Sequence, residues 1–242
     1  MNLQSIRIIL VETTHPGNIG SSARAMKNMG LKNLYLVKPK QFPDEHATAM
    51  AVNAHDILTN CVVVNSLSVA LQGCKLIFAT SARSRSIDLP TSTPYDCAKL
   101  LASVESNTQI AIIFGRENTG LTNDELLQCN YHIHIPTNIE YNSLNLSQSV
   151  QIMCYEIRMR YLKTPPELIK IYQHTATADE LSDFYIHLTE LLFAINFFKT
   201  KNHIRIERRI RRLFNRMHLE TLEVRILRGI ISKIQYQLKR LQ

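Results

Sequence analysis

Asn18 and Arg24 follow the first predicted strand and are the first residues whose chemistry suggests a site. They lie in the segment His15–Arg24, where Gly17 and Gly20 turn the chain from a strand into a helix. An amide and a guanidinium six residues apart can both face the carboxyl ends of a parallel sheet, where ligands of open α/β sheets generally bind. Alone this segment is weak evidence, because such turns are common and Arg24 could be a surface ion-pair partner.

A second segment combines an apolar strand with a glycine-flanked loop. The run Ile110–Phe114 is followed by Gly115, Glu117 and Gly120. Glycine directly after a buried strand lets a ligand approach the backbone closely, because no Cβ atom is in the way, although a turn alone would also favour it. This loop is therefore a second candidate for ligand binding.

A third polar segment begins where a predicted strand ends at Ile135 and Pro136. It continues through Asn142, Ser143 and Asn145 into a long predicted helix. Serine and asparagine are common helix caps, so capping alone would account for them. Together, three polar loops after three strands are expected to meet at one edge of the sheet.

The elements that must position these loops alternate along the first part of the chain. Short β-rich runs and helical stretches follow one another up to about Leu162, which predicts an α/β fold around a mainly parallel sheet. The predicted strands are Ile6–Val11, Asn33–Val37, Val62–Asn65, Leu76–Ala79, Ile110–Phe114 and His132–Ile135. The predicted helices are Gly20–Met29, His46–Ile57, Ser66–Leu71, Pro94–Val104, Asn123–Cys129 and Leu146–Tyr161. The continuous apolar run at 110–114 indicates a central strand covered on both faces.

A proline pair after Leu162 predicts a domain boundary. Pro165 and Pro166 interrupt the helical pattern, because proline lacks the amide donor and restricts the preceding residue. We therefore expect one domain at residues 1–162 and a basic helical extension at 163–242, with about three helices whose apolar stripes are buried. The stripes run through Leu181, Phe184, Tyr185, Leu188, Leu191, Leu192 and Ile195, then Ile206, Ile210, Leu213, Phe214 and Met217, and finally Leu219, Leu222, Ile226, Ile230, Ile234 and Leu238.

Positive charge is concentrated in the C-terminal extension. The net charge of the chain is +8, but residues 199–242 hold 13 Lys and Arg against 3 Asp and Glu, so the remainder is slightly acidic. Counterion release favours a polyanion as the partner of such a segment, although a wet helix face that supports a dimer would have a similar composition. The candidates for RNA binding are Arg83 and Arg85 after a predicted strand, and Arg208, Arg209, Arg211 and Arg212 within the cluster Arg205–Arg216.

The sequence also indicates a cellular compartment. No apolar run is long enough to cross a bilayer, and we interpret the short stretch Ile6–Val11 as a strand rather than a leader. The five cysteines are odd in number and contain no C-x-x-C pair, which favours reduced thiols over zinc or redox chemistry. We therefore expect a cytoplasmic protein without a membrane partner.

In combination, the three segments resemble a known family. In order and spacing, N-x-x-x-x-x-R, F-G-x-E-x-x-G-L and I-P followed by S-L-N-L-S resemble the signature segments of the SpoU (TrmH-like) RNA 2′-O-methyltransferases of the SPOUT superfamily, over residues 5–162. The segments Val11–Asn18, Thr80–Arg85, Tyr141–Leu146 and Ile206–Phe214 resemble more narrowly a group that methylates tRNA. The target in that group is the cytidine or uridine at position 32, which opens the anticodon loop.

The resemblance implies a fold, a cofactor and roles for individual residues. The family fold adds a C-terminal trefoil knot to the sheet, and its members are usually homodimers that need no metal. S-adenosylmethionine would contact Thr80, Ser81, Ala82, Gly115, Ile135, Asn142, Ser143 and Leu144. Arg24 would be the catalytic base, with Asn18, Glu117, Ser143 and Asn145 around it or the ribose. A guanidinium normally stays protonated, so Arg24 could instead hold a phosphate or stabilise the developing alkoxide.

Other functions remain open at this stage. A SpoU methyltransferase for ribosomal RNA, or for another tRNA position, would share the three segments. A non-catalytic RNA-binding protein of the same fold is a different class, and the presence of Asn18, Arg24, Glu117 and Asn145 argues against it. A flavodoxin-like nucleotide-binding domain would leave the coincidence of three segments without explanation.

Overall fold

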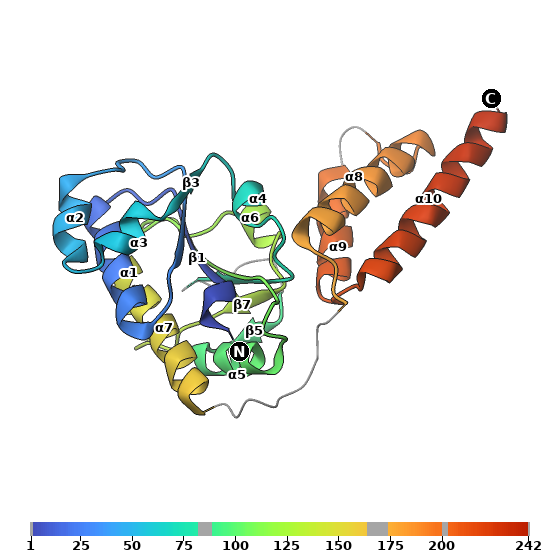
Figure 1. Cartoon of the computed structure of the whole chain (residues 1–242). Coiled ribbons are helices and arrows are strands. Elements are labelled where there is room, and N and C mark those ends of the chain that lie inside the picture. The colour runs from blue at the N-terminus through green and yellow to red at the C-terminus, as the bar shows by residue number, and fades with distance from the viewer. Residues whose placement is uncertain (1, 82–88, 164–173, 200–202, 242) are drawn as a thin grey trace.

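A parallel sheet forms the centre of the computed structural model, which describes residues 2–81, 89–163, 174–199 and 203–241. Within these residues the sheet has seven strands in the order β3-β2-β1-β6-β4-β7-β5 (Figure 1). The strands are β1 (Ile6–Val11), β2 (Asn33–Val37), β3 (Val62–Val64), β4 (Leu76–Thr80), β5 (Thr91–Ser92), β6 (Ile110–Phe114) and β7 (Tyr131–Ile133). β6 pairs with β1 and β4, and all its residues are buried, which confirms the central strand expected from its apolar run.

Helices cover the two faces of this sheet unequally. Alternate strand residues point to opposite faces, so Ile8 and Leu10 belong to one core and Ile9 and Val11 to the other. The first core is covered by α1 (Pro16–Met29), α2 (Glu45–Ala51), α3 (His55–Thr59), α5 (Pro94–Ser103) and α7 (Leu146–Lys163). The second is covered by the four-residue helices α4 (Leu67–Ala70) and α6 (Asn123–Leu126). A short 3-10 helix (Leu3–Ser5) precedes β1.

Three helices near the C-terminus lie on the side of α4 and α6 (Figure 1). They are α8 (Ala178–Ala194), α9 (His203–Asn215) and α10 (Thr221–Leu241), and their shared core contains Phe184, Tyr185 and Leu191. The backbone N–H of Ala178 donates to the carbonyl of Cys74 at 2.9 Å, which fixes the start of α8 against the end of the α4 turn. These helices thus pack on the thinly covered side of the sheet.

Two predicted helices have different bounds in the structure. The stretch predicted as one helix at 46–57 is divided into α2 and α3, because Val52 has φ of 53° and cannot continue an α-helix. The helix predicted to start at Gly20 begins at Pro16, with His15 as its cap, so Asn18 lies in the first turn of α1 rather than in a loop. Proline is favoured at this first position because the helix needs no amide donor there.

Two further differences concern short or exposed elements. The two-residue strand β5 has no sequence signal, because it is too short to show a period. In α10 the predicted stripe at 222, 226, 230 and 234 is between 41% and 63% exposed, so the prediction that it is buried is wrong. Buried or packed positions are Val224, Leu227, Ile231 and Leu238. Steps of three, four and seven residues keep one face of a 3.6-residue helix, whereas repeated steps of four drift around it.

The five cysteines are free, and all except Cys61 are buried. Burial raises the pKa of Cys74 to about 11 and that of Cys154 to about 12, so these thiols stay protonated near neutral pH. This agrees with the expected reduced thiols. Within the described residues, no helix has both the length and the apolar character needed to span a bilayer.

Candidate functional site

Glu117 is the centre of a polar cluster at the carboxyl edge of the sheet. Its Oε1 accepts hydrogen bonds from Asn18 Nδ2 at 3.0 Å and from the backbone N–H of His15 at 3.3 Å. Its Oε2 accepts from the backbone N–H and the Oγ1 of Thr14, at 3.1 and 2.9 Å. Because a carboxylate has about four lone-pair positions, these donors occupy all of its acceptor capacity. Glu117 is therefore a positioning residue for α1 and has no free lone pair to take a proton.

The pKa of Glu117 reflects these contacts. Partial burial is the largest single influence and raises the pKa, but the donors from Asn18 and from the backbone of Thr14, Glu117 and His15 together outweigh it. The pKa therefore lies below its ordinary value of 4.5. Glu117 is ionised near neutral pH, as an acceptor of four hydrogen bonds requires.

The carboxylate also fixes the orientation of two asparagine side chains. Since Asn18 must donate its amide to Glu117, its oxygen faces Asn145, whose Nδ2 donates to it at 3.0 Å. Asn145 Oδ1 in turn accepts from the backbone N–H and the Oγ of Ser147 at the start of α7, at 2.9 and 2.7 Å. One N–H of Asn145 and the exposed hydroxyl of Ser143 have no partner among the described residues. These two groups are therefore available to a substrate.

Arg116 ties the following loop to the rest of the sheet edge. Its guanidinium pairs with Glu12 after β1 at 2.9 Å and with Glu125 in α6 at 3.0 Å. Hydrogen bonds to both carboxylates raise the pKa of Arg116, although burial opposes them, so the group stays charged. Gly120 closes the loop through two backbone hydrogen bonds with Arg116. Arg116 therefore positions the loop rather than a substrate.

The reason for glycine at position 115 differs from the one expected. A Cβ atom there would lie 2.3 Å from the carbonyl carbon of Gly120 and 2.4 Å from the nitrogen of Leu121. The close approach that requires glycine is thus made by the other side of the same loop. Gly115 also borders a cavity, so its backbone remains accessible to a ligand.

A cavity of about 170 Å³ brings the third segment beside this loop. It is lined by every residue predicted to contact the cofactor except Ala82, which lies outside the described residues. Those residues are Thr80, Ser81, Gly115, Ile135, Asn142, Ser143 and Leu144, and Glu117 borders the same cavity. Sites for whole small molecules enclose roughly 300 to 1,000 Å³, so a cofactor as large as S-adenosylmethionine would extend beyond the enclosed part.

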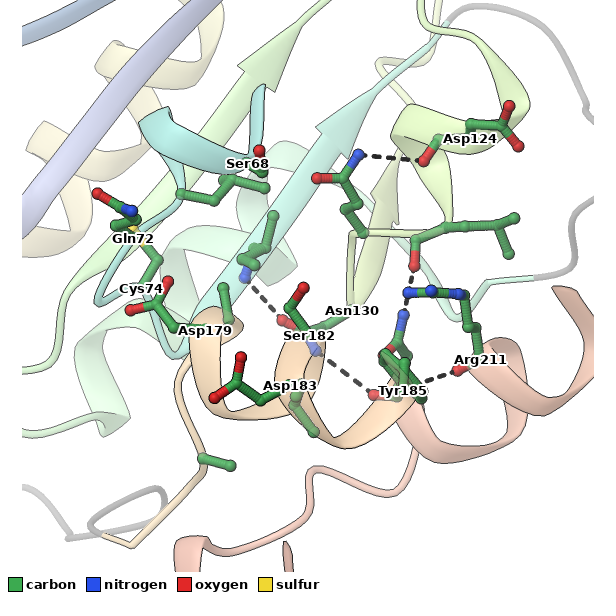
Figure 2. Close-up of a pocket in the computed structure, with 18 of the residues that line it drawn as sticks. Ser68, Gln72, Cys74, Asp124, Asn130, Asp179, Ser182, Asp183, Tyr185 and Arg211 are labelled. Carbon is green, nitrogen blue, oxygen red and sulfur yellow. Dashed lines mark hydrogen bonds between the residues drawn. The ribbon is translucent and has the colours of Figure 1, made fainter. Parts of the chain in front are cut away.

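A larger cavity, about 610 Å³, lies between the sheet domain and the C-terminal helices (Figure 2). Asp179, Ser182 and Asp183 border it from α8, and Arg211 from α9. Ion pairs already engage the arginines of its wall, as described below, and none of the residues predicted to bind cofactor or ribose lines it. We therefore take the smaller cavity, next to the Glu117 cluster, as the candidate active site.

Arg24 is not part of this cluster. It is exposed on α1 and has no hydrogen bond or ion pair with the described residues. Six residues along an α-helix correspond to a rise of about 9 Å and leave Arg24 about 120° around the axis from Asn18. The expectation that Asn18 and Arg24 of the same chain both face the carboxyl edge of the sheet is therefore wrong. Arg24 instead occupies a surface that another molecule can reach.

The predicted RNA-binding arginines have different surroundings. Arg83 and Arg85 lie outside the described residues. Arg208 pairs with Asp124 of α6 at 2.7 Å, and Arg211 pairs with Glu207 at 3.0 Å and stacks on the ring of Tyr185. Arg209 is exposed and Arg212 is half-buried.

Sequence reasoning missed the residues that hold the loops in place. The ion pair of Arg116 with Glu12 joins residues 104 positions apart in the chain, and no local pattern indicates it. The lysines after β2, Lys38 and Lys40, were also missed, because the segment between two predicted elements showed no motif. The only available signal was position: both follow a predicted strand at its carboxyl end.

Comparisons with known proteins agree with this arrangement. The model of the SpoU rRNA methylase family matches residues 5–155, and that of the tRNA methyltransferase TrmJ C-terminal domain matches residues 179–242. The chain is 47% identical to the tRNA (cytidine/uridine-2′-O-)-methyltransferase TrmJ of Photorhabdus laumondii, over 96% of this chain and 98% of that protein.

Two solved structures are similar over almost the whole chain. TrmJ from Z. mobilis ZM4 has a TM-score of 0.85 at 31% identity, with 95% of this chain and 98% of that one covered. A probable methylase family protein from Haemophilus influenzae Rd KW20 has a TM-score of 0.65 at 40% identity, with 99% and 100% covered. The resemblance noted in the sequence is thereby confirmed.

Proposed function

Because this chain belongs to the SpoU methylase family, we propose that it transfers a methyl group from S-adenosylmethionine to a ribose 2′-hydroxyl of tRNA. The Glu117–Asn18–Asn145 network beside the small cavity is the observation that carries this proposal. It joins all three polar segments at one edge of the sheet. The name of the TrmJ relatives supports cytidine or uridine as the target, and position 32 is proposed from the resemblance of the sequence motifs alone.

The residues around the cavity fit the proposed cofactor. S-adenosylmethionine would supply an electrophilic methyl group on a sulfonium. Backbone groups of the Gly115–Gly120 loop and of Asn142, Ser143 and Leu144 would hold it, with Thr80, Ser81 and Ile135 completing the wall. Thr80 is fixed by its own hydrogen bond to the carbonyl of Ile113 at 3.0 Å, so it contributes shape rather than a free donor.

The cluster supplies donors rather than a base. An N–H of Asn145 and the hydroxyl of Ser143 are free donors near the cavity. Donors aimed at the oxygen that loses its proton stabilise the negative charge that develops there. Glu117 holds this arrangement without touching the reacting atoms. Because Arg24 does not face the cavity of its own chain, it would add its positive charge from the exposed face of α1 to a neighbouring phosphate or, in a homodimer, beside the 2′-oxygen in the partner's site.

Replacement of Arg24 by alanine tests the assigned roles. Arg24 does not line the cavity, so Arg24→Ala should abolish methylation and leave the affinity for S-adenosylmethionine largely unchanged. Methylation assays and calorimetric titration of the cofactor measure the two properties separately. Ser21→Ala, on the same helix, is a control that should retain activity. An equal loss of cofactor binding in Arg24→Ala would show that the role is wrong.

The α9 arginines suggest where tRNA would bind outside the active site. Arg205, Arg209 and Arg212 follow one another at spacings of four and three residues, which places them on one side of α9. Arg208 and Arg211 form ion pairs within the protein, with Asp124 and Glu207. We therefore propose that Arg209, which is exposed, contacts tRNA, and that Arg208 and Arg211 act mainly in holding α9. Arg83, Arg85 and Arg212 remain candidates.

The remaining features of the family are proposed on the same basis. We propose the trefoil knot from membership of the family. Tyr141, Tyr155 and Leu162 are 79%, 47% and 61% exposed, which supports a homodimer through this region. We also propose a boundary between residues 1–162 and 163–242, and a cytoplasmic location, where tRNA is found.

A further inference from the structure

Lys38 and Lys40 stand beside the Glu117 cluster, on the loop between β2 and α2. Both are exposed. The backbone N–H of Lys40 donates to the carbonyl of Thr13 at 3.0 Å, and the next residue, Thr14, donates two hydrogen bonds to Glu117. The lysine loop and the cluster therefore share the segment that follows β1.

The backbone at Lys38 is strained. Its φ is 46°, and that of Glu12 is 48°. These residues occupy equivalent places, because each follows one member of the strand pair Val11 and Val37. A residue with a Cβ atom rarely adopts this left-handed conformation, and such strain is concentrated at functional sites. At Glu12 the side chain accounts for the strain, since its carboxylate holds Arg116.

No contact within the described residues accounts in the same way for Lys38. Within that part of the chain, the ammonium groups of Lys38 and Lys40 have no hydrogen bond or ion pair. The hydrogen bond from Arg116 is the main cause that lowers the pKa of Glu12, and Lys40 and Lys38 add smaller effects of the same sign. The charges of Lys38 and Lys40 thus act on this edge of the sheet. The carboxylate of Glu12 there is already paired with Arg116.

The charge of the edge makes these lysines useful to an RNA ligand. Without them, three carboxylates, Glu12, Glu117 and Glu125, face one guanidinium, Arg116. The proposed 2′-oxygen target lies next to a phosphate in any RNA chain, so an edge of net negative charge would repel the substrate. The two exposed lysines bring the net charge of this edge to zero, which would allow the phosphates next to the target ribose to approach it.

We propose that Lys38 and Lys40 bind the RNA backbone phosphates that flank the methylated ribose. This inference rests on the proposed function, and it assigns the lysines to positioning and not to the methyl transfer itself. Phosphate contacts of this kind orient the RNA without reading its bases.

The test compares Lys38→Gly, Lys38→Gln and Lys40→Gln with the unaltered protein. The control is Lys32→Gln, since Lys32 is also exposed but precedes β2, at the opposite edge of the sheet. Affinity for unmodified tRNA is measured at several salt concentrations, together with Tm and affinity for S-adenosylmethionine.

We expect each site variant to weaken tRNA binding roughly fivefold to tenfold and to reduce the salt slope by about one. Lys38→Gly should also raise Tm, because glycine removes the strain, so stability and RNA affinity would change in opposite directions. Cofactor affinity and the Lys32→Gln variant should remain unchanged.

Two results would overturn the inference while leaving the proposed function intact. In the first, the unaltered protein binds and methylates tRNA, and all three site variants bind tRNA with the same affinity as the unaltered protein. The other is an equal loss in Lys32→Gln, which would indicate a general effect of charge. If the unaltered protein neither binds nor methylates tRNA, the proposed function fails, and this inference fails with it.

Discussion

At the scale of single residues, Glu117 shows how a carboxylate in an active site can act without chemistry of its own. Four donors occupy its oxygens, and this fixes Asn18 and, through Asn18, the free amide of Asn145. Loss of the charge would leave those donors without a strong acceptor. The contribution of Glu117 is therefore to the geometry of the site.

The depressed pKa of Glu117 predicts a pH dependence. Its ionised form adds stability that is fully present above the ordinary pKa of 4.5 and is lost as the pH falls through the lower folded-state pKa. Glu117→Gln should therefore lower Tm at neutral pH and flatten the decline of Tm in acid. Thermal unfolding between about pH 3 and pH 7 measures this.

The matched control is Glu190→Gln, an exposed carboxylate on α8. It should leave the acid limb of the Tm profile unchanged. An identical profile for Glu117→Gln and the unaltered protein would contradict the assigned role.

The sequence could predict the type and location of many candidate residues, but not their individual contacts. Asn18, Glu117 and Asn145 were expected near one another and are linked by hydrogen bonds. Arg24 was expected beside Asn18, and the structure places it elsewhere because the helix begins four residues earlier than predicted. The catalytic and cofactor-binding roles stay predictions.

At the scale of elements, the Gly115–Gly120 loop depends on close contact between its two ends. Gly115→Ala would place a Cβ atom 2.3 Å from Gly120, so the loop must move. We expect a loss of about 1–3 kcal/mol in the free energy of unfolding and at least a tenfold loss of cofactor affinity.

Gly229 provides the matched control for that substitution. It lies within α10, and a Cβ atom there would meet nothing within 4 Å. Gly229→Ala should therefore stabilise the protein by about 0.5–1 kcal/mol, because alanine favours the helix. Chemical denaturation compares both variants. A destabilised Gly229→Ala, or an undisturbed Gly115→Ala, would contradict the loop geometry.

The contact between α9 and the sheet domain depends on a buried asparagine. Asn215 Nδ2 donates to the carbonyl of Leu127 at 2.6 Å, and its Oδ1 accepts from the hydroxyl of Tyr185 at 2.6 Å. Asn130 Nδ2 donates to the carbonyl of Asn215 at 3.4 Å. These bonds join α8, α9 and the segment after α6 in one buried network.

Removal of that side chain should weaken the contact. Asn215→Ala leaves the Leu127 carbonyl without this donor, which costs about 1–3 kcal/mol for a buried group. Tyr185→Phe, which removes only one hydroxyl, should cost less. Thermal unfolding measures the effect, and an equal Tm for Asn215→Ala and the unaltered protein would contradict it.

The lengths of the elements limited what the sequence could reveal. The long apolar run of β6 was predicted correctly, because both its faces are buried. The break at Val52 depends on tight packing of α1 against α2, where Gly20 meets the backbone of Ala47, and no single segment contains that information. The exposed stripe of α10 was mistaken for a core face because apolar composition alone does not indicate which face has a partner.

At the scale of the whole molecule, positive charge is concentrated at one end of the chain. The sheet domain, which carries the candidate site, is nearly neutral, and the C-terminal helices, of which α9 and α10 hold the excess of positive charge, pack on its thinly covered side (Figure 1). Charge asymmetry was visible in the sequence, whereas the docking of α9 through Asn215 was not. The proposed assignment of the arginines follows from this docking, since it separates Arg208 and Arg211, which hold α9, from Arg209, which is exposed.

Salt dependence should distinguish these two sets of arginines. Arg209→Gln should weaken tRNA binding and reduce the salt slope by about one, because an exposed phosphate contact is lost. Arg208→Gln breaks the ion pair with Asp124 instead and should change the slope less. Filter binding at several salt concentrations measures both, and the reverse order would contradict the assignment.

Methylation of unmodified tRNA by the purified protein tests the central proposal most directly. The tRNA is incubated with S-adenosylmethionine, digested to nucleosides and analysed by mass spectrometry, with Arg24→Ala as the inactive control. The proposal predicts one new 2′-O-methylated cytidine or uridine in the anticodon loop, absent from the control. A methyl group on a base, or no methylated nucleoside at all, would contradict it.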